Sequence, residues 1–169
     1  MKKLFTTILI LMTFLAVSST AQGDSSKKLK FRATLSGAQE VPEVVTDTTG
    51  RITIEFNDAL SEAVFRLVVR DGVGVTAAHF HCERPGRNGP VVIFLFAGAV
   101  TDVDGELASG TLTNAGFLPA GATVCPGLIG RPVNNIASLA FAMRDGLVYA
   151  NVHTVAHPGG EARGQLSED

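Results

Sequence analysis

The chain has 169 residues, with 14 Lys and Arg against 16 Asp and Glu, and a formal net charge of −2. This length suits one domain. A mildly acidic chain has no electrostatic attraction for nucleic acid or anionic lipid, so we expect no nucleic-acid partner.

The first 21 residues show the pattern of a secretory signal peptide. A positive start, MKK, precedes the apolar run LFTTILILMTFLAV and the small residues SSTAQG, which predicts cleavage after Ala21. The apolar run is too short and wrongly flanked for a stable membrane span. We expect a secreted or periplasmic protein with no membrane span after cleavage, and an uncleaved N-terminal anchor is the alternative. A polar tether, residues 22–28, then leads to a domain over residues 29–166.

Alternation of apolar and polar residues predicts strands in the first half of this domain. Four segments show it: LKFRATL (29–35), RITIEF (51–56), EAVFRLVVRDG (62–72) and TAAHFH (76–81). The third segment ends on Asp-Gly, which indicates a turn before the fourth.

Further strands are predicted in the second half. VVIFLF (91–96) is apolar on both faces and is typical of a central strand covered on both sides, and LASGTLT (107–113), LVYANVHT (147–154) and EARGQL (161–166) follow. TDVDGE (101–106) predicts a turn rather than a calcium loop, because the remaining calcium ligands are missing. Strands about ten residues apart with Gly and Asp turns favour an all-β antiparallel sandwich or barrel.

One segment, VNNIASLAFAMRDG (133–146), has helical periodicity instead. Its apolar residues are Ile136, Leu139, Ala140 and Met143. Asn134 or Asn135 can cap the start and Gly146 can close the end, which predicts a short amphipathic helix near 135–145.

The two cysteines, Cys82 and Cys125, are the smallest number that can pair. In an oxidising compartment they predict a disulfide that closes a loop of about 44 residues. Two free thiols, or a thiolate metal ligand at Cys82, are the alternatives.

The histidines supply the most specific chemistry. In an extended TAAHFH, His79 and His81 share one face, opposite the core residue Phe80. In LVYANVHT, His153 shares a face with Asn151 and Tyr149, and that face is expected to be exposed. If the two strands are neighbours, three imidazoles meet on the outer face of the sheet. Three imidazoles can hold Cu²⁺ or Zn²⁺ and leave one position open.

A structural polar network of the same imidazoles is the alternative to this metal site. Asn151 is one candidate neighbour of the imidazoles. On the outward face of the last strand, Glu161 can accept a hydrogen bond from an imidazole, and Arg163 can clamp a loop carbonyl or carboxylate. The alternative for Glu161 and Arg163 is a solvated charge pair. His157, followed directly by Pro158, is interpreted as a loop residue.

Four blocks of the chain together resemble the CHRD domain, a family first recognised in chordin, the animal antagonist of bone morphogenetic proteins, and found again in exported bacterial proteins. The blocks are LSGAQEVPEVVTDTTGRITIEF, AAHFHCERPGRNGPVVIFLF, YANVHT and HPGGEARGQL, in the family's order. The resemblance implies an immunoglobulin-like β-barrel or sandwich with limited similarity to copper/zinc superoxide dismutases. It implies no settled molecular function.

The His79-x-His81 pair before a Gly-rich loop is similar to the copper-strand motif of those dismutases. Their paired-metal site needs more histidines than the four in this chain. A single-metal site at His79, His81 and His153 is compatible with that number.

Two functions follow from this reasoning. The first is a non-catalytic extracellular or periplasmic binding module, which contacts a protein or matrix component and is not an enzyme. The second is a mononuclear copper or zinc protein, with a redox role in the case of copper.

Overall fold

The computed structural model describes residues 28–119 and 121–169. The predicted signal peptide and residues 22–27 of the predicted tether lie outside the described residues. In chain order, the elements are β1 (Lys30–Ser36), β2 (Thr49–Phe56), β3 (Glu62–Cys82), β4 (Val91–Thr113), β5 (Val124–Cys125), β6 (Arg131–Pro132), α1 (Ile136–Arg144), β7 (Val148–Thr154), β8 (Ala162–Gln165) and β9 (Ser167–Glu168).

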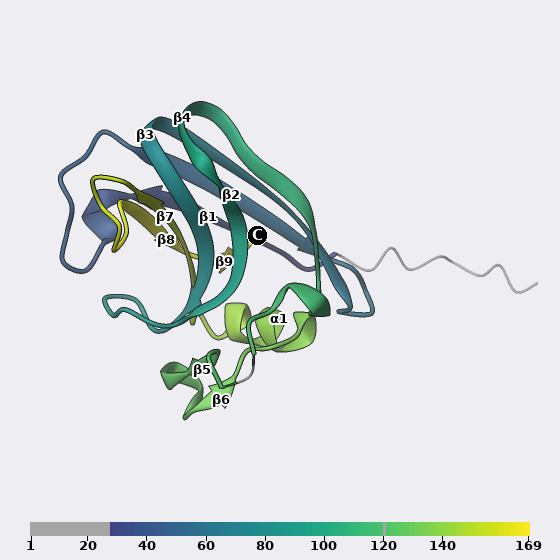
Figure 1. The fold of residues 1–169 in the computed structure, drawn as a ribbon. Coiled ribbons are helices and arrows are strands. Elements are labelled where there is room, and N and C mark those ends of the chain that lie inside the picture. Colours follow the sequence, from purple (N-terminus) through teal and green to yellow (C-terminus); the bar gives the residue numbers. More distant parts are fainter. Residues whose placement is uncertain (1–27, 120) are drawn as a thin grey trace, which may run out of the picture.

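The main sheet is antiparallel and closes on itself. Its strand order is β2-β1-β8-β7-β3-β4, and β2 also pairs with β3. This closure is possible because β3 pairs with β2 through its first half and with β7 through its second half, from Val75 to Cys82. Figure 1 shows the strands curving around a common interior, with α1 and the small β5–β6 hairpin at one end. The predicted all-β antiparallel fold with one short helix is confirmed.

The core fills the interior of this barrel. Along β1, exposed and buried residues alternate as the sequence predicts, so that Phe31 and Leu35 point inward. Phe31 meets Phe56 of β2 edge to face, with ring centroids 5.9 Å apart. Phe80 of β3 is also fully buried. Burying each such side chain contributes roughly 2–3 kcal/mol, which makes this alternation the main determinant of register.

Two predicted turns are wrong, because β3 and β4 each continue through them. At 71–72 the backbone forms a bulge, with Asp71 at φ 52° and a register shift between Val69 and Gly72. Gly72 lies so close to the neighbouring strand that a Cβ there would stand 2.9 Å from the Val103 side chain. TDVDGE lies within β4, where Gly105 pairs with Val69. Pairing with β3 satisfies these backbone groups better than a turn would, so the Asp and Gly residues are absorbed as irregularities.

The prediction that 91–96 forms a central strand is also wrong. β4 stands at the end of the strand order, and beyond β3 its only described bridge joins Ile93 to Phe117. Phe94 is therefore 44% exposed. Its ring lies beside the histidines described below.

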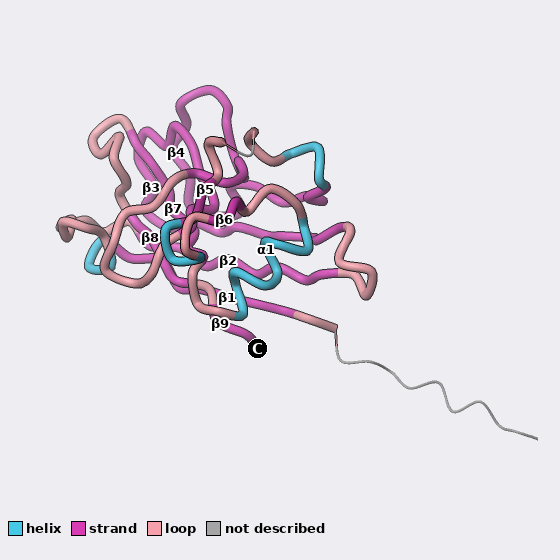
Figure 2. The backbone as a smooth tube through the Cα atoms, turned by 90° about the horizontal axis from the view of Figure 1, so that it is seen from below, coloured by secondary structure: helices cyan, strands magenta, loops and turns pink. Residues whose placement is uncertain are grey.

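Helix α1 begins with a capping box. Asn135 accepts a hydrogen bond from the Ser138 backbone, the Ser138 hydroxyl accepts one from the Asn135 backbone, and Gly146 with φ 67° follows the last turn. The predicted apolar face is buried. Figure 1 and Figure 2 show α1 at one end of the barrel, where it lies close to β3, β7 and β9. In the described part of the chain, no helix has the length and apolarity that crossing a membrane requires.

The predicted disulfide between Cys82 and Cys125 is confirmed. It joins the last residue of β3 to β5 across a sequence separation of 43 residues. The described residues hold no free cysteine, so the thiol alternatives do not apply.

Candidate metal site

The three predicted histidines lie together on the seam between β3 and β7. In this seam Ala77 pairs with His153, and His79 pairs with Asn151. The His79 and His153 ring centroids are 4.7 Å apart, and that of His81 lies 5.5 Å from His79 and 5.7 Å from His153. One nitrogen from each ring can be chosen so that all three lie within 4.8 Å of one another. This spacing suits three ligands of one ion.

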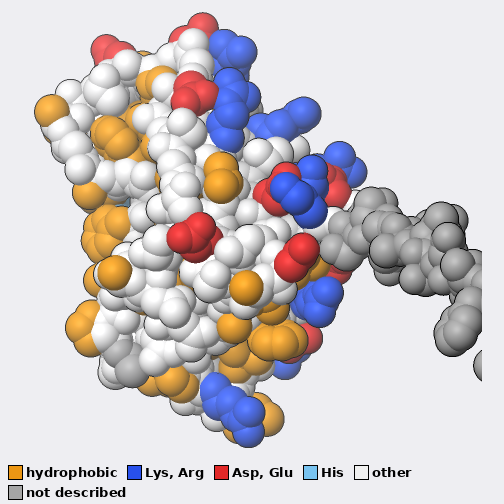
Figure 3. Space-filling view, turned by 90° about the vertical axis from the view of Figure 1, so that its right-hand side faces the viewer, with side chains coloured by type: hydrophobic (Ala, Val, Ile, Leu, Met, Phe, Trp, Pro, Cys, Tyr) orange, Lys and Arg blue, Asp and Glu red, His pale blue; other side chains and the backbone are white. Residues whose placement is uncertain are grey.

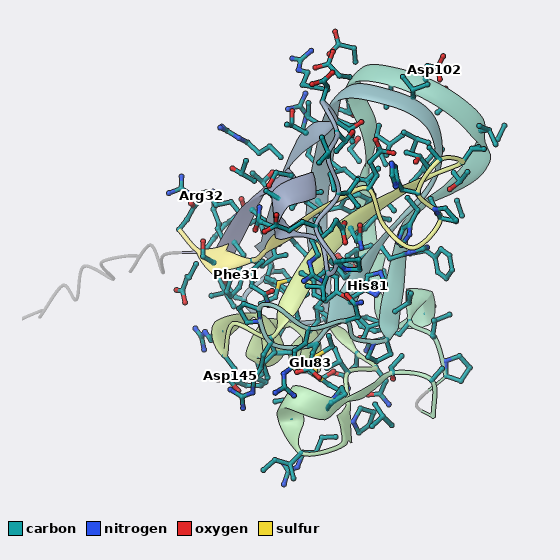
Figure 4. All side chains as sticks on the ribbon, turned by 90° about the vertical axis from the view of Figure 1, so that its left-hand side faces the viewer. Phe31, Arg32, His81, Glu83, Asp102 and Asp145 are labelled. Carbon is teal, nitrogen blue, oxygen red and sulfur yellow. A yellow bond between two sulfur atoms is a disulfide. The ribbon has the colours of Figure 1, made fainter. Side chains whose placement is uncertain are left out.

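The histidines are buried, which corrects the expectation that their face is exposed. His79 and His153 are each 8% exposed and His81 is 7% exposed. They lie on the face of the sheet opposite the apolar core, as strand parity predicts, but other parts of the chain cover that face. The Phe94 ring stands edge-on to His79 with centroids 4.4 Å apart. Figure 4 shows His81 in the middle of the molecule and Asp102 far from it, at the bend of β4.

Backbone carbonyls determine which ring nitrogen of two histidines carries the proton. His81 Nδ1 lies 3.0 Å from the Gly89 carbonyl oxygen, and His153 Nδ1 lies 3.0 Å from the Pro158 carbonyl oxygen. A carbonyl only accepts hydrogen bonds, so each Nδ1 must be the protonated donor. The Nε2 atoms of both rings are therefore lone-pair acceptors. This arrangement is typical of metal-binding histidines.

The tautomer of His79 follows from that of His153. His79 Nδ1 lies 3.1 Å from His153 Nε2, and because His153 Nε2 is an acceptor, His79 Nδ1 is the donor. His79 Nε2 therefore carries no proton and presents a lone pair. Both His79 Nε2 and His81 Nε2 are buried and have no hydrogen-bond partner. Buried polar atoms without a partner are rare and costly, and a bound ion is one of their recognised explanations.

The electrostatics keep the rings neutral. Burial, together with the neighbouring His153 and His81, lowers the pKa of His79 to about 4. Burial also lowers the pKa of His81 to about 4, against the opposing effect of its Gly89 hydrogen bond. The pKa of His153 is lowered by burial as well. At neutral pH all three lone pairs are therefore available to a metal.

Tyr149 and Arg163 support this arrangement from one side. Tyr149 stacks on His81 with centroids 4.9 Å apart and planes within 9°, and its hydroxyl accepts a hydrogen bond of 3.0 Å from Gly89 N. The Arg163 guanidinium lies 4.9 Å from the Tyr149 ring centroid. Gly89 thus contacts two members of the stack, which fixes the loop against the histidines.

Arg163 is buried and holds two loops together. Its Nε donates to the Gln39 carbonyl, and its Nη1 donates to the Arg87 carbonyl at 3.2 Å and to Asn88 Oδ1 at 2.8 Å. Asn88 in turn donates to the Val41 carbonyl at 2.8 Å. At 4% exposed, Arg163 is not part of a solvated charge pair. It ties the loop after β1 to the loop after β3.

Glu161 is buried but does not contact an imidazole. Its carboxylate accepts hydrogen bonds from the hydroxyls of Thr46, Thr48 and Thr154. Burial alone would raise the pKa of Glu161, but these three hydrogen bonds outweigh it and lower the pKa. The role expected of Glu161, accepting from an imidazole, is filled by the Gly89 and Pro158 carbonyls.

Glu40 is a buried acid that sequence reasoning missed. It is 5% exposed, its Oε1 has no hydrogen-bond partner, and burial raises its pKa to about 7 in spite of Arg163. Asn151, opposite His79, is 3% exposed and its Oδ1 is also unpartnered. A Cβ at Gly160 would stand 2.6 Å from Asn151 Nδ2 and 2.9 Å from the Glu40 oxygens, so only glycine fits there. No periodic signal marks Glu40, because a loop brings it to the site.

Comparison with known proteins identifies the family. The model of the CHRD domain matches residues 31–166, which is nearly the whole chain. The chain belongs to the CHRD domain family. No curated protein and no solved structure shows significant similarity to it.

Proposed function

We propose that this CHRD domain binds one transition-metal ion, copper or zinc, through His79, His81 and His153. The observation that carries the proposal is the pair of buried lone pairs without a partner, on His79 Nε2 and His81 Nε2. An ion near these atoms would accept electron density from both and would replace the contact between His79 and His153. A purely structural network would be expected to satisfy its own members, and this one leaves two of its acceptors unused.

The ligands are prepared for an ion before it arrives. The Gly89 and Pro158 carbonyls hold two rings in the tautomer that presents Nε2. Arg163 holds one of those carbonyls in place through its bonds to the neighbouring Arg87 and Asn88. Preorganised ligands lose little entropy on binding, which favours affinity. Three imidazoles leave one position on the ion open.

Metal content and calorimetry of protein purified without an affinity tag test the proposal. We expect one equivalent of copper or zinc, bound with micromolar or tighter affinity. His81→Ala and His153→Ala should each weaken binding by at least about 100-fold, since two ligands hold an ion far less well than three. His157→Ala is the matched control, because His157 lies outside the cluster. If the wild type binds neither ion, or if His81→Ala and His153→Ala bind as tightly as His157→Ala and the wild type, the cluster is structural.

The place of action is part of the same proposal. The Cys82–Cys125 disulfide and the leader-like sequence of residues 1–21 support export to the periplasm or the exterior. Cell fractionation and the mass of the exported chain test it. We expect a mature N-terminus at Gln22, and a full-length chain retained inside the cell would contradict the proposal.

Contact with an extracellular protein or matrix component is a second proposal, and one surface feature favours it. Val73, Val100 and Val155 are 70%, 59% and 66% exposed, and a Cβ at Gly74 would lie within 4 Å of Val155 and Val100. Clustered exposed apolar side chains are a feature of interaction sites. Retention of the labelled protein on matrix material should fall in a Val73→Ser, Val155→Ser variant. Equal retention of wild type and variant would contradict this second proposal.

A further inference from the structure

The charges around the candidate metal site are unusual for a site that holds a divalent ion. All three ligands are neutral imidazoles, and among the described residues no carboxylate or thiolate joins their group. The buried acids Glu40, Glu83 and Glu161 have other partners. Glu161 accepts from three threonines, Glu83 accepts from the Arg84 backbone, and Glu40 interacts with Arg163 and Asn151. The closest fixed charge in the stack is positive, because Arg163 lies over Tyr149, which stacks on His81.

The site is also shielded from water. Each imidazole is less than a tenth exposed, and the Phe94 ring covers His79 with its edge. The desolvation cost of an ion rises with the square of its charge, so a monovalent ion loses about a quarter of what a divalent ion loses on burial. A divalent ion here would need an anion from solvent in its fourth position to offset that cost. A monovalent ion would not.

The number of available ligands also favours a monovalent ion. Zn²⁺ in proteins is almost always four-coordinate, and Cu²⁺ prefers a tetragonal arrangement of N and O ligands. The described residues offer three nitrogens within 4.8 Å of one another, and an aromatic ring rather than a fourth donor lies against His79. Three neutral nitrogen donors complete the coordination of the cuprous ion, Cu⁺, which accepts low coordination numbers.

We infer that the three-histidine site selects Cu⁺ over Zn²⁺ and Cu²⁺. This inference rests on the proposed function and names its ligand. Competition titrations test it, with Cu⁺ kept reduced by ascorbate in the absence of oxygen, which leaves the disulfide intact. Bicinchoninate competes for Cu⁺ and a fluorescent chelator competes for Zn²⁺. We expect Cu⁺ to bind at one equivalent, at least about 100-fold more tightly than Zn²⁺, because of the difference in desolvation. X-ray absorption of the Cu⁺ form should show three nitrogen ligands.

A charge placed on the edge strand, at the position of the ring that covers His79, sharpens the test. Phe94 lies on an edge strand and is 44% exposed, so Phe94→Asp should fold, and its carboxylate would stand beside His79. This variant should gain at least tenfold in Zn²⁺ affinity relative to Cu⁺, whereas Phe141→Asp on the exposed face of α1 should leave the ratio unchanged.

The possible outcomes separate this inference from the proposed function. Equal or tighter binding of Zn²⁺ or Cu²⁺ by the wild type, lost in His81→Ala, would overturn the preference for Cu⁺ and leave the metal site standing. An unchanged ratio in Phe94→Asp would also contradict it, because the desolvation argument requires a carboxylate to favour the divalent ion. Absence of binding by all three ions would overturn the inference and the proposed function together.

Discussion

The two halves of strand β3 lie in opposite environments. From Glu62 to Arg70, its outer face carries charged side chains in water, and Arg66 and Arg70 reach Glu106 and Asp104 of β4 at 2.6 and 3.1 Å. From Val75 to Cys82, both faces are largely covered, and the outer face carries the histidines. Figure 3 shows Lys and Arg side chains gathered along one side of the surface, with Asp and Glu among them.

The difference in exposure decides how a polar atom without a hydrogen-bond partner is interpreted in each half. At the surface, water satisfies any polar atom, so a missing partner carries no information. In the covered half, a polar atom that finds no protein partner loses its hydration without replacement. The two imidazole nitrogens without a partner, His79 Nε2 and His81 Nε2, therefore point to a ligand. The charged residues of the first half only form a solvated face.

The largest expected effect concerns the covered half. Replacing Cys82 and Cys125 by serine removes the link between the end of β3 and β5. The unfolded chain gains the freedom of a loop of more than 40 residues, which should cost roughly 4 kcal/mol of unfolding free energy. Urea unfolding of the variant and of the wild type with its disulfide intact measures the difference. A loss below about 1 kcal/mol would show that the covered half does not depend on this link.

The next effect compares a buried arginine with an exposed one. Arg163→Met removes the donors to the Gln39 and Arg87 carbonyls and to Asn88, and leaves buried acceptors unsatisfied. We expect a loss of about 3 kcal/mol. Metal affinity should fall as well, because the loop that carries the Gly89 carbonyl loses its clamp. Equal unfolding curves for Arg163→Met and wild type would contradict the clamp.

The strands and the loops that cover the histidines differ in how far the sequence predicts them. Alternation correctly predicts most strands, the core side of Phe80, and the common face of His79 and His81, because strand parity is a local property. Parity does not reveal what covers a face. The loop that carries Glu40 reaches the site only because the barrel closes, and this long-range closure has no local signal.

The two wrongly predicted turns also reflect long-range pairing that the local sequence does not reveal. Asp-Gly at 71–72 satisfies the local rule for a turn, but the pairing of β3 with β4 on both sides of it is stronger, and the same residues form a bulge. The turn predicted for TDVDGE (101–106) is wrong for the same reason. In both places tertiary pairing outweighs local preference.

The pH dependence of stability tests the buried titratable groups in metal-free protein. His79 and His81 have a folded pKa of about 4 against 6.5 for the free side chain, so the unfolded state takes up protons first and their contribution is lost as the pH falls from about 6.5. Glu40 acts oppositely, since its folded pKa of about 7 lies above 4.5 and its protonated form is favoured by folding. Its contribution is lost as the pH rises.

Stability of the wild type should therefore rise between pH 4.5 and 6.5 with a slope of at least about one net proton, two from His79 and His81 less one from Glu40, and the lowered pKa of His153 adds to this slope. Glu40→Gln removes the opposing group, so its slope should be steeper than that of the wild type by about one proton. Urea unfolding in the presence of a chelator, at half-unit pH steps, measures both slopes. Identical slopes would show that Glu40 does not titrate in this range.

The smallest expected effect lies in the solvated half, where Arg66→Met serves as the counterpart of Arg163→Met. The Arg66–Glu106 pair is short, at 2.6 Å, but Arg66 is 61% and Glu106 43% exposed, so water replaces most of what the pair provides. We expect the unfolding free energy to change by less than about 1 kcal/mol, and less still in 0.5 M salt, in which exposed charges are screened. A loss that matches that of Arg163→Met would mean that burial does not decide how much an arginine contributes to stability in this barrel. A difference of several-fold between the two variants would show that burial determines how much an arginine stabilises this barrel, because the two substitutions remove the same functional group.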